Sequence, residues 1–454
     1  MEPFYNIEFN KKEKLSIILQ LALIFIMHLT PVYSSNISYL FLTLLSFIAF
    51  RVPSTSFIFL SATQYLPYPE MSSLNPALIT PFLWIISSFI YNYKIYFFNL
   101  KVITPFLIFF IWYITFTRTS FSIESYEYIK CLIFGLITYN MIILSNGEFL
   151  KIIFSFSLGA FGITSAYWAN TLGLPVELST WGGEREGFLR LGGVRADSVM
   201  VWPPILVAFG GFLGIIISKI YELNNIDRKT KKFFYLLLLL SALLIPPLIA
   251  TMTHGGLGGV SIMFSIIVFL FFKLYNRNSI NSSSRVIIRH IFFSIFLIFI
   301  TVSTFNLFGI TSRVNALEMF YEEQSEEMGA VGSRTDVWET AINTIKKYPF
   351  FGVPANVKEE IPKQYQYLGY YLSHNVFLDV GRQSGIIGII LYAIFFFWNI
   401  IYLYKKKYFI FAPFLLIHLA FLIFWMSLSF GYYKSFWIFW FITFMVRKST
   451  IDNN

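Results

Sequence analysis

The amino-acid sequence predicts an all-α polytopic membrane protein with about 12–14 transmembrane helices and a large helical loop on one side of the bilayer. Three observations lead to this prediction. Of the 454 residues, 56% are hydrophobic and only 13% are charged, whereas soluble domains carry about 25% charged residues. The apolar residues form many runs of about 17–25 residues, the length that crosses a bilayer. Basic clusters lie in alternate connections between these runs, as the positive-inside rule requires.

The apolar runs give the positions of the expected helices. They begin near Leu15, Ile37, Ala77, Lys101, Tyr128, Leu150, Ser198, Phe233, Gly256, His290, Gly385, Tyr408 and Gly431. Arg51 and Pro53 interrupt the run over 37–66. Because proline breaks a helix interior, we expect either one long broken helix or two short ones there. Basic residues precede the first run and no small-residue cleavage site follows it, so this run is expected to be retained rather than cleaved as a signal peptide.

The placement of the basic residues predicts the orientation in the membrane. Lys11, Lys12 and Lys14 precede the first run, and further clusters lie at 228–232 and 405–407. If both termini are cytoplasmic, all of these clusters lie on the cytoplasmic side, as the positive-inside rule requires. Topology and contact with membrane lipid therefore account for the net charge of +10, and no nucleic-acid partner is expected.

Two connections on the outer side are too long to be simple turns. We expect transmembrane helices over residues 1–308 with an outer Arg- and Gly-rich loop at 169–197, an outer helical loop over 309–384, and C-terminal transmembrane helices over 385–454. This organisation leaves the two outer loops as the places where polar chemistry is expected.

The longer outer loop is expected to contain helices of its own. Apolar residues at helical spacing predict an amphipathic helix over Thr335–Lys347, and Pro349 ends it because proline cannot continue a helix. A second helix is expected to begin near His374 and to continue into the apolar run after Gly385.

The shorter outer loop carries Arg185, Arg190 and Arg195 among glycines, although outer loops are normally poor in arginine. Guanidinium groups bind phosphate through paired hydrogen bonds, and glycines allow close approach of a ligand to the backbone. These arginines are therefore candidates for binding a diphosphate or an acidic sugar. The alternative is contact with lipid headgroups and pairing with neighbouring acidic residues. Arg195 is favoured because it adjoins the next apolar run.

Three further outer residues are candidates for a site. Arg334 follows a Gly-Ser turn and opens the predicted helix, where the helix dipole favours an anion; a salt bridge to Asp336 is the alternative. His374 lies at the end of the longer loop and could act as a general base near neutral pH; capping of the following helix is the alternative. His254 lies in a tight outer turn with glycines and is a candidate to line the same site.

Several motifs of other enzyme classes are missing from the sequence. It contains no phosphate-binding loop, no Gly-x-Ser-x-Gly elbow, no zinc-ligand spacing, no dinucleotide fingerprint and no Asp-x-Asp pair. Cys131, the single cysteine, lies in an apolar run, so no disulfide framework is expected. We therefore expect no metal and no cofactor, and chemistry carried by arginine and histidine.

In order along the chain, the motifs of residues 333–392 resemble the C-terminal signature of the O-antigen ligase and polymerase superfamily of bacterial inner membranes. These motifs are Ser333-Arg334-x-x-x-Trp338, Tyr348-Pro349-Phe350-x-Gly352-Val353, Ser373-His374-Asn375-x-x-Leu378 and Gly385-x-x-Gly388. The resemblance implies a GT-C-like glycosyltransferase in the inner membrane, with its active site facing the periplasm. Such proteins transfer a glycan from undecaprenyl diphosphate to an acceptor hydroxyl, without a metal or a nucleotide.

The resemblance also implies roles for particular residues. His374 is implied to activate or orient the acceptor hydroxyl, and Arg334 and Arg195 to hold the diphosphate, with Asn375 beside the substrate. A base that removes the hydroxyl proton and cations that stabilise the departing diphosphate form a consistent mechanism. The chain departs from the family where Thr253-His254-Gly255 replaces a frequent Ser-Arg-Gly. His254, Arg185 or Arg190 would then supply that phosphate contact.

The resemblance leaves two activities open. We favour a polymerase that joins lipid-linked oligosaccharide repeat units, for which a chain-length regulator protein is a further expected partner. The alternative is a ligase that transfers the finished glycan to the lipid A core. A lipid-oligosaccharide transporter is less favoured, because the ionisable residues lie at the outer face and the sequence shows no internal repeat.

Overall fold

Helices make up nearly all of the described chain. The computed structural model describes residues 7–63, 65–66, 76–97, 100–116, 123–176, 184–185, 188–189, 198–222, 227–251, 254–276, 285–290, 293, 330–353, 373–407, 409–427 and 434–452. Its first helices are α1 (Lys11–Met27), α2 (Thr30–Tyr33), α3 (Ile37–Arg51), η2 (Pro53–Thr55), α4 (Ser56–Ala62), α5 (Pro76–Ile90), α6 (Leu100–Phe116), α7 (Ile123–Leu144), α8 (Phe149–Gly162) and α9 (Ser165–Thr171). Further along lie α10 (Ser198–Glu222), α11 (Arg228–Ala242), α12 (Ile245–Ala250), α13 (His254–Tyr275), α16 (Ala330–Lys347), α17 (Val376–Lys407), α18 (Ala412–Ser427) and α19 (Lys434–Asp452).

The described residues confirm the expected all-α polytopic membrane fold. Five helical segments are long and apolar enough to cross a membrane, and the bent pair of α8 and α9 would make a sixth. The five are Glu127–Leu144, Val201–Glu222, Arg228–Ala250, Gly258–Tyr275 and Val376–Lys405. Shorter apolar helices lie at Ile37–Arg51, Leu78–Ile90, Ile103–Phe116 and Ala412–Ser427. Within these described ranges the number is below the about 12–14 expected, and the run expected near His290 falls mostly outside them.

The run over 37–66 divides into two helices, one of the two alternatives that the sequence left open. α3 ends at Arg51, Val52 leaves the helical conformation with φ −126° and ψ 88°, and the short 3₁₀ turn η2 leads into α4. Pro53 starts η2 because proline fits the first position of a helix but cannot continue the preceding one. The bend places α4 against α8.

The centre of the molecule is α10. Its apolar window Val201–Glu222 is completely buried, and the helix packs against α8, α11, α13 and α18. Contact with α18 is close because Gly214 has no side chain: a Cβ there would overlap the backbone of Pro413. Small residues allow helix backbones to approach in this way in membrane proteins.

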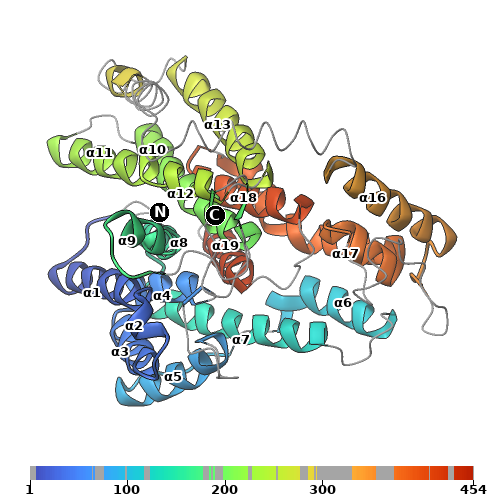
Figure 1. Ribbon diagram of the computed structural model, residues 1–454, viewed down its shortest axis with the longest axis horizontal. Helices are drawn as coiled ribbons and strands as arrows, with labels where there is room; N and C mark the ends of the chain where they lie inside the picture. The colour runs from blue at the N-terminus through green and yellow to red at the C-terminus, as the bar shows by residue number, and fades with distance from the viewer. Residues whose placement is uncertain are drawn as a thin grey trace.

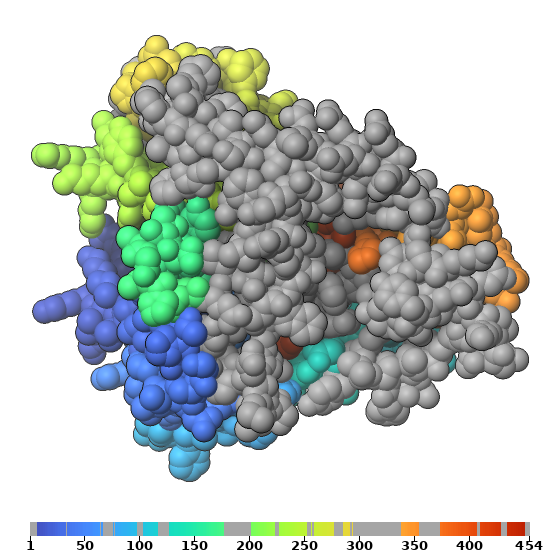
Figure 2. Space-filling model, viewed as in Figure 1, coloured from blue at the N-terminus to red at the C-terminus, as the bar shows by residue number. Residues whose placement is uncertain are grey.

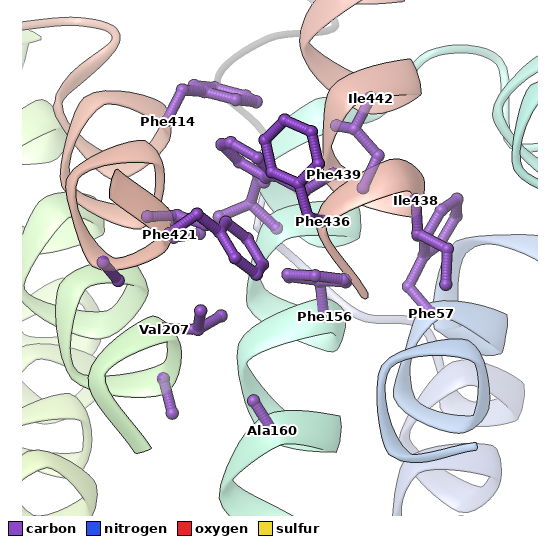
Figure 3. Packing of buried hydrophobic residues seen from close by; sticks show 14 of the residues in the cluster. Phe57, Phe156, Ala160, Val207, Phe414, Phe421, Phe436, Ile438, Phe439 and Ile442 are labelled. Carbon is purple, nitrogen blue, oxygen red and sulfur yellow. The ribbon is translucent and has the colours of Figure 1, made fainter. Parts of the chain in front are cut away.

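Aromatic side chains fill the space between α8, α18 and α19. Figure 3 shows Phe421 of α18 turned toward Phe436 and Phe439 of α19, with Phe156 of α8 nearby. The ring centroids of Phe421 lie 5.3 Å from those of Phe436 and 5.6 Å from those of Phe439. Aromatic pairs at such spacings are favourable beyond the area that they bury. This packing fixes α18 and α19 beside α17.

A buried polar cluster holds the amino-terminal end of α1. Glu13 accepts the backbone N–H of Asn10 at 2.8 Å and the hydroxyl of Ser54 at 2.6 Å. The ammonium group of Lys151 lies 3.2 Å from the Glu13 carboxylate, and both residues are only 4% exposed. Burial of a charge is tolerated when an opposite charge and hydrogen bonds surround it, so this cluster joins α1, η2 and α8.

The two ends of the molecule differ in character. Figure 1 shows α1 and α11 at one end of the long axis and α16 at the other. Figure 2 shows the orange surface of α16 at the corresponding edge. At the first end, Lys229 at the start of α11 forms an ion pair of 2.8 Å with Glu8, just before α1. The basic starts of α1 and α11 therefore lie together, opposite α16.

Candidate functional site

His374 lies in a turn that leads into α17, at the end of the molecule that carries α16. Its φ of 53° is in the left-handed region, which a residue with a Cβ adopts only at a cost of about 1–2 kcal/mol. Ser373 and Asn375 on either side are buried, whereas His374 is partly exposed. The turn therefore presents the imidazole and encloses its neighbours.

Asn375 caps α17. Its side-chain oxygen accepts the backbone N–H groups of Phe377 at 3.0 Å and Leu378 at 3.3 Å, two of the donors that a helix start leaves without intrahelical partners. The amide nitrogen contacts the sulfur of Met426 in α18 at 3.9 Å. The expected helix beginning near His374 is thus confirmed, with its first helical residue at Val376. In this structure the Asn375 amide is engaged with α17 and α18.

A buried carboxylate lies one turn into α17 and bonds back to the turn. Asp379 accepts the backbone N–H of Ser373 and the Ser373 hydroxyl, each at 2.9 Å. The guanidinium of Arg382 lies 3.6 Å from the same carboxylate oxygen. Arg382 and Asp379 are 4% and 7% exposed, so water screens their attraction only weakly. The pair supplies a fixed negative group beneath the turn.

α16 completes the enclosure of the turn. Trp338 donates its indole N–H to the carbonyl of Ser373 at 2.9 Å, and Val337 and Ala341 of the same helix are fully buried. The expected amphipathic helix is confirmed at its C-terminal end, Lys347. Its start is five residues earlier than expected, at Ala330 rather than Thr335.

The early start of α16 corrects the expected position of Arg334. We expected Gly332 and Ser333 to form a turn before the helix, but both lie within it, and Arg334 is not at the helix N-terminus. Glycine and serine cost no more than about 1 kcal/mol in a helix, so packing against α17 overrides that preference. The argument from the helix dipole at Arg334 therefore no longer applies.

The motif Tyr348 to Val353 docks against a break in α17. At Gly385 the backbone adopts φ 76° and ψ −176°, so the helix is interrupted. Two backbone hydrogen bonds cross this break: Val353 N–H donates to the carbonyl of Arg382 at 3.0 Å, and Ile386 N–H donates to that of Pro349 at 2.7 Å. These bonds partner main-chain groups at the break, where helical bonding is lost. We refer to 349–353 and 382–386, joined in this way, as the clamp.

α6 packs on the other side of the clamp. Trp112 donates its indole N–H to the carbonyl of Ser384 at 3.0 Å, and Tyr113 donates its hydroxyl to the side-chain oxygen of Gln383. The ring of Phe351 stacks on Trp112 and Phe116, with centroids 5.7 Å and 4.8 Å apart. The signature motifs are therefore brought together by three helices: α16, α17 and α6.

The other predicted site residues are described only in part. Arg185 lies in a hairpin of β1 (Glu184–Arg185) and β2 (Phe188–Leu189), in which it pairs with Phe188. His254 is the first residue of α13. Arg190 and Arg195 lie outside the described residues, and the side chains of Arg185, His254 and Arg334 are not described.

Several residues of this site were not found from the sequence. Asp379 and Arg382 lie in what reads as the start of an apolar span, yet charged residues three apart share one helix face and are costly in such a span. That cost was the available signal. For Trp112 and Tyr113, whose partners lie 272 and 270 residues away, the sequence offered none.

Comparison with known proteins adds an independent finding. Residues 235–393 match a protein-family model described as O-antigen ligase. The matched region runs from within α11 into α17 and includes Arg334, His374 and the clamp. No match was found among curated protein sequences. Together with the polytopic helical fold, the family match supports the O-antigen polymerase and ligase superfamily for this chain.

Proposed function

We propose that the protein is an O-antigen polymerase, or a polymerase of a similar surface polysaccharide, that joins undecaprenyl-diphosphate-linked oligosaccharide units at the periplasmic face. The observation that carries this proposal is the partly exposed His374, in a left-handed turn that Ser373, Asn375 and Asp379 hold from both sides. The family match supports a glycan-processing enzyme with a lipid-linked glycan as substrate.

The proposed reaction is a glycosyl transfer that needs no metal, because the lipid diphosphate is itself the leaving group. The acceptor hydroxyl oxygen bonds to the anomeric carbon of the donor, and the bond from that carbon to the diphosphate breaks with its electrons. His374 takes the hydroxyl proton as general base. Arg334, Arg195, Arg185 and Arg190, with His254, hold the diphosphate and stabilise its growing charge.

The proposal makes His374 the most sensitive residue. Loss of a general base typically lowers a rate by about 10²–10⁴-fold, so His374→Ala should abolish glycan chain growth while the protein still inserts in the membrane. His290→Ala is a matched control, because His290 is exposed in the described segment 285–290 and has no place in the proposed site. Full-length glycan ladders in cells that carry only His374→Ala would overturn the role of His374.

The arginines are tested by binding of the donor. Hydrogen bonds to charged groups contribute about 1.5–3 kcal/mol, so Arg195→Ala and Arg334→Ala should each weaken capture of a lipid-diphosphate donor by about 10–100-fold. If both variants bind the donor as the parent protein does, the diphosphate is held elsewhere.

A ligase is the second candidate function, because the matching family model is described as O-antigen ligase. Deletion of the gene in its host followed by a glycan gel separates the two. A core that carries one repeat unit indicates a polymerase. A core without any repeat, with polymer left on the lipid carrier, indicates a ligase.

We further propose an inner-membrane location with cytoplasmic termini and a periplasmic site. The support is the grouping of the basic starts of α1 and α11 at the end opposite α16 (Figure 1), as the positive-inside rule expects. Cys131 is buried, so introduced cysteines can be read with little background. A membrane-impermeant maleimide should label Asn343→Cys on α16 in intact cells with a permeable outer membrane, and Lys232→Cys only after lysis. The opposite pattern would reverse the topology.

A further inference from the structure

A buried polar cluster fixes the backbone on both sides of His374. It consists of Ser373, Asp379, Arg382 and the indole of Trp338, and we refer to it as the turn cluster. Ser373 is the residue on which it converges: its N–H and hydroxyl both donate to Asp379 at 2.9 Å, and its carbonyl accepts from Trp338 at 2.9 Å. All backbone polar groups of Ser373 are thereby engaged, one residue before His374.

Asp379 is the centre of this arrangement. One of its carboxylate oxygens accepts both Ser373 donors and faces the Arg382 guanidinium at 3.6 Å. Hydrogen bonds to a charged acceptor are stronger than neutral ones, and Arg382 keeps the carboxylate ionised inside a region from which water is excluded. The backbone N–H of Asp379 also donates to the Asn375 carbonyl at 3.0 Å, so Asp379 contacts the residues before and after His374.

The conformation of His374 explains why such a cluster is required. A left-handed φ of 53° is strained for a residue other than glycine, and strain of this kind persists only where the surroundings impose it. A change in φ by some tens of degrees would move the imidazole by ångströms. Misplacement of a reacting group by about 1 Å can lower a rate by about 10²-fold.

We propose that Asp379, with Arg382 as its counter-charge, is a positioning residue for the transfer reaction. It acts through Ser373 to hold His374 in the left-handed conformation that presents the imidazole to the acceptor hydroxyl. This inference rests on the role of His374 in the proposed function. Since the donor diphosphate is assigned to other residues, loss of Asp379 affects the transfer step more than it affects donor binding.

The Glu13 cluster at the opposite end of the molecule provides a matched control. Glu13 also accepts a backbone N–H and a hydroxyl and also faces a buried cation. It joins helices, as the turn cluster does, but it does not flank a residue in the left-handed conformation. Trp440 provides a second control, because its indole donates to the Phe395 carbonyl at 2.9 Å, the same bond as that of Trp338.

The experiment measures transfer by the full-length protein in lipid nanodiscs with a lipid-linked oligosaccharide as donor. Asp379→Asn keeps the shape of the side chain and removes its charge, and should lower kcat by about 10–100-fold with the donor KM changed less than about 2-fold. Asp379→Glu should recover part of the rate, because it restores the charge. Ser373→Ala and Trp338→Phe should each lower kcat by about 3–10-fold, since each removes one bond of the cluster. Glu13→Gln and Trp440→Phe should leave kcat within about 2-fold.

The outcomes separate the inference from the proposed function. If His374→Ala is inactive while Asp379→Asn, Ser373→Ala and Trp338→Phe keep the parental kcat, positioning by Asp379 is refuted and the role of His374 stands. If His374→Ala transfers normally, the proposed function fails whatever the other variants do. A fall in kcat that is equal in the cluster variants and in both controls, and that follows thermal stability, would assign Asp379 a structural role only.

Discussion

Substitution of Gly385 by alanine tests the clamp most directly. At this residue φ is 76° and ψ is −176°, a region of backbone conformation that is almost restricted to glycine and costs other residues about 1–3 kcal/mol. A Cβ at Gly385 would also lie 2.6 Å from the backbone nitrogen of Phe351 and overlap the Phe350 carbonyl. These are main-chain atoms, so no rotation of a side chain relieves the overlap.

The segment opposite Gly385 must therefore move, and the two hydrogen bonds across the clamp are lost with it. Each is worth about 0.5–1.5 kcal/mol net. Together with the conformational cost, we expect Gly385→Ala to lower the free energy of opening the clamp by about 2–6 kcal/mol. Because about 1.4 kcal/mol corresponds to a tenfold change in an equilibrium constant, the exchange of the protected amides should accelerate by at least about 30-fold.

Hydrogen–deuterium exchange followed by mass spectrometry measures this directly. Peptides that contain the amides of Val353 and Ile386 should exchange faster in Gly385→Ala, while peptides from α10 keep their protection. Gly258→Ala is the control, since a Cβ there meets no atom within 4 Å, and alanine is favoured over glycine in a helix by about 0.5–1 kcal/mol. Parental protection at both amides in Gly385→Ala would show that the clamp does not hold the break in α17.

Other predictions concern the frame of the molecule. Gly214→Ala should destabilise the α10–α18 contact by about 1–3 kcal/mol, because the added Cβ meets the backbone of Pro413; an unchanged melting temperature in detergent would contradict this. Lys151→Ala should lower stability by about 3–5 kcal/mol, since it removes the counter-charge of a carboxylate that is 4% exposed; wild-type amounts of folded protein would argue against it. Asp227 caps α11 through the N–H of Thr230 at 2.9 Å, and that bond lowers the pKa of Asp227 below its ordinary value. The cap therefore stabilises the protein fully above the unfolded-state pKa of about 3.9 and loses its effect as the pH falls through the lower folded-state pKa. Asp227→Asn should differ from the parent in amide exchange at α11 near pH 6, and this difference should shrink as the pH approaches about 3; a constant difference would refute the assignment.

The fold was predictable where a helix is determined by residues close together in sequence. The division of the run over 37–66 follows from Pro53, which cannot continue a helix wherever it is placed. The end of α16 follows from Pro349 in the same way. The start of α16 does not, because Gly332 and Ser333 have only a weak preference against helix, and contact with α17 decides the outcome.

The site was predictable only in part, for a related reason. His374 attracts attention in the sequence because a histidine beside a membrane span has few structural uses. Asp379 becomes part of the site only when the left-handed turn folds Ser373 back over the first turn of α17. That conformation has no marker in the sequence, since left-handed residues are usually glycine or asparagine.

The contact between α6 and the clamp has a consequence for the design of chimeric proteins. Trp112 and Tyr113 bond to Ser384 and Gln383, yet α6 lies outside the region over 235–393 that carries the family match. An exchange of that region alone between two members of the family would transfer the whole signature and separate it from the helix that supports it. Chimeras intended to exchange glycan specificity should therefore carry Leu100–Phe116 together with the C-terminal region.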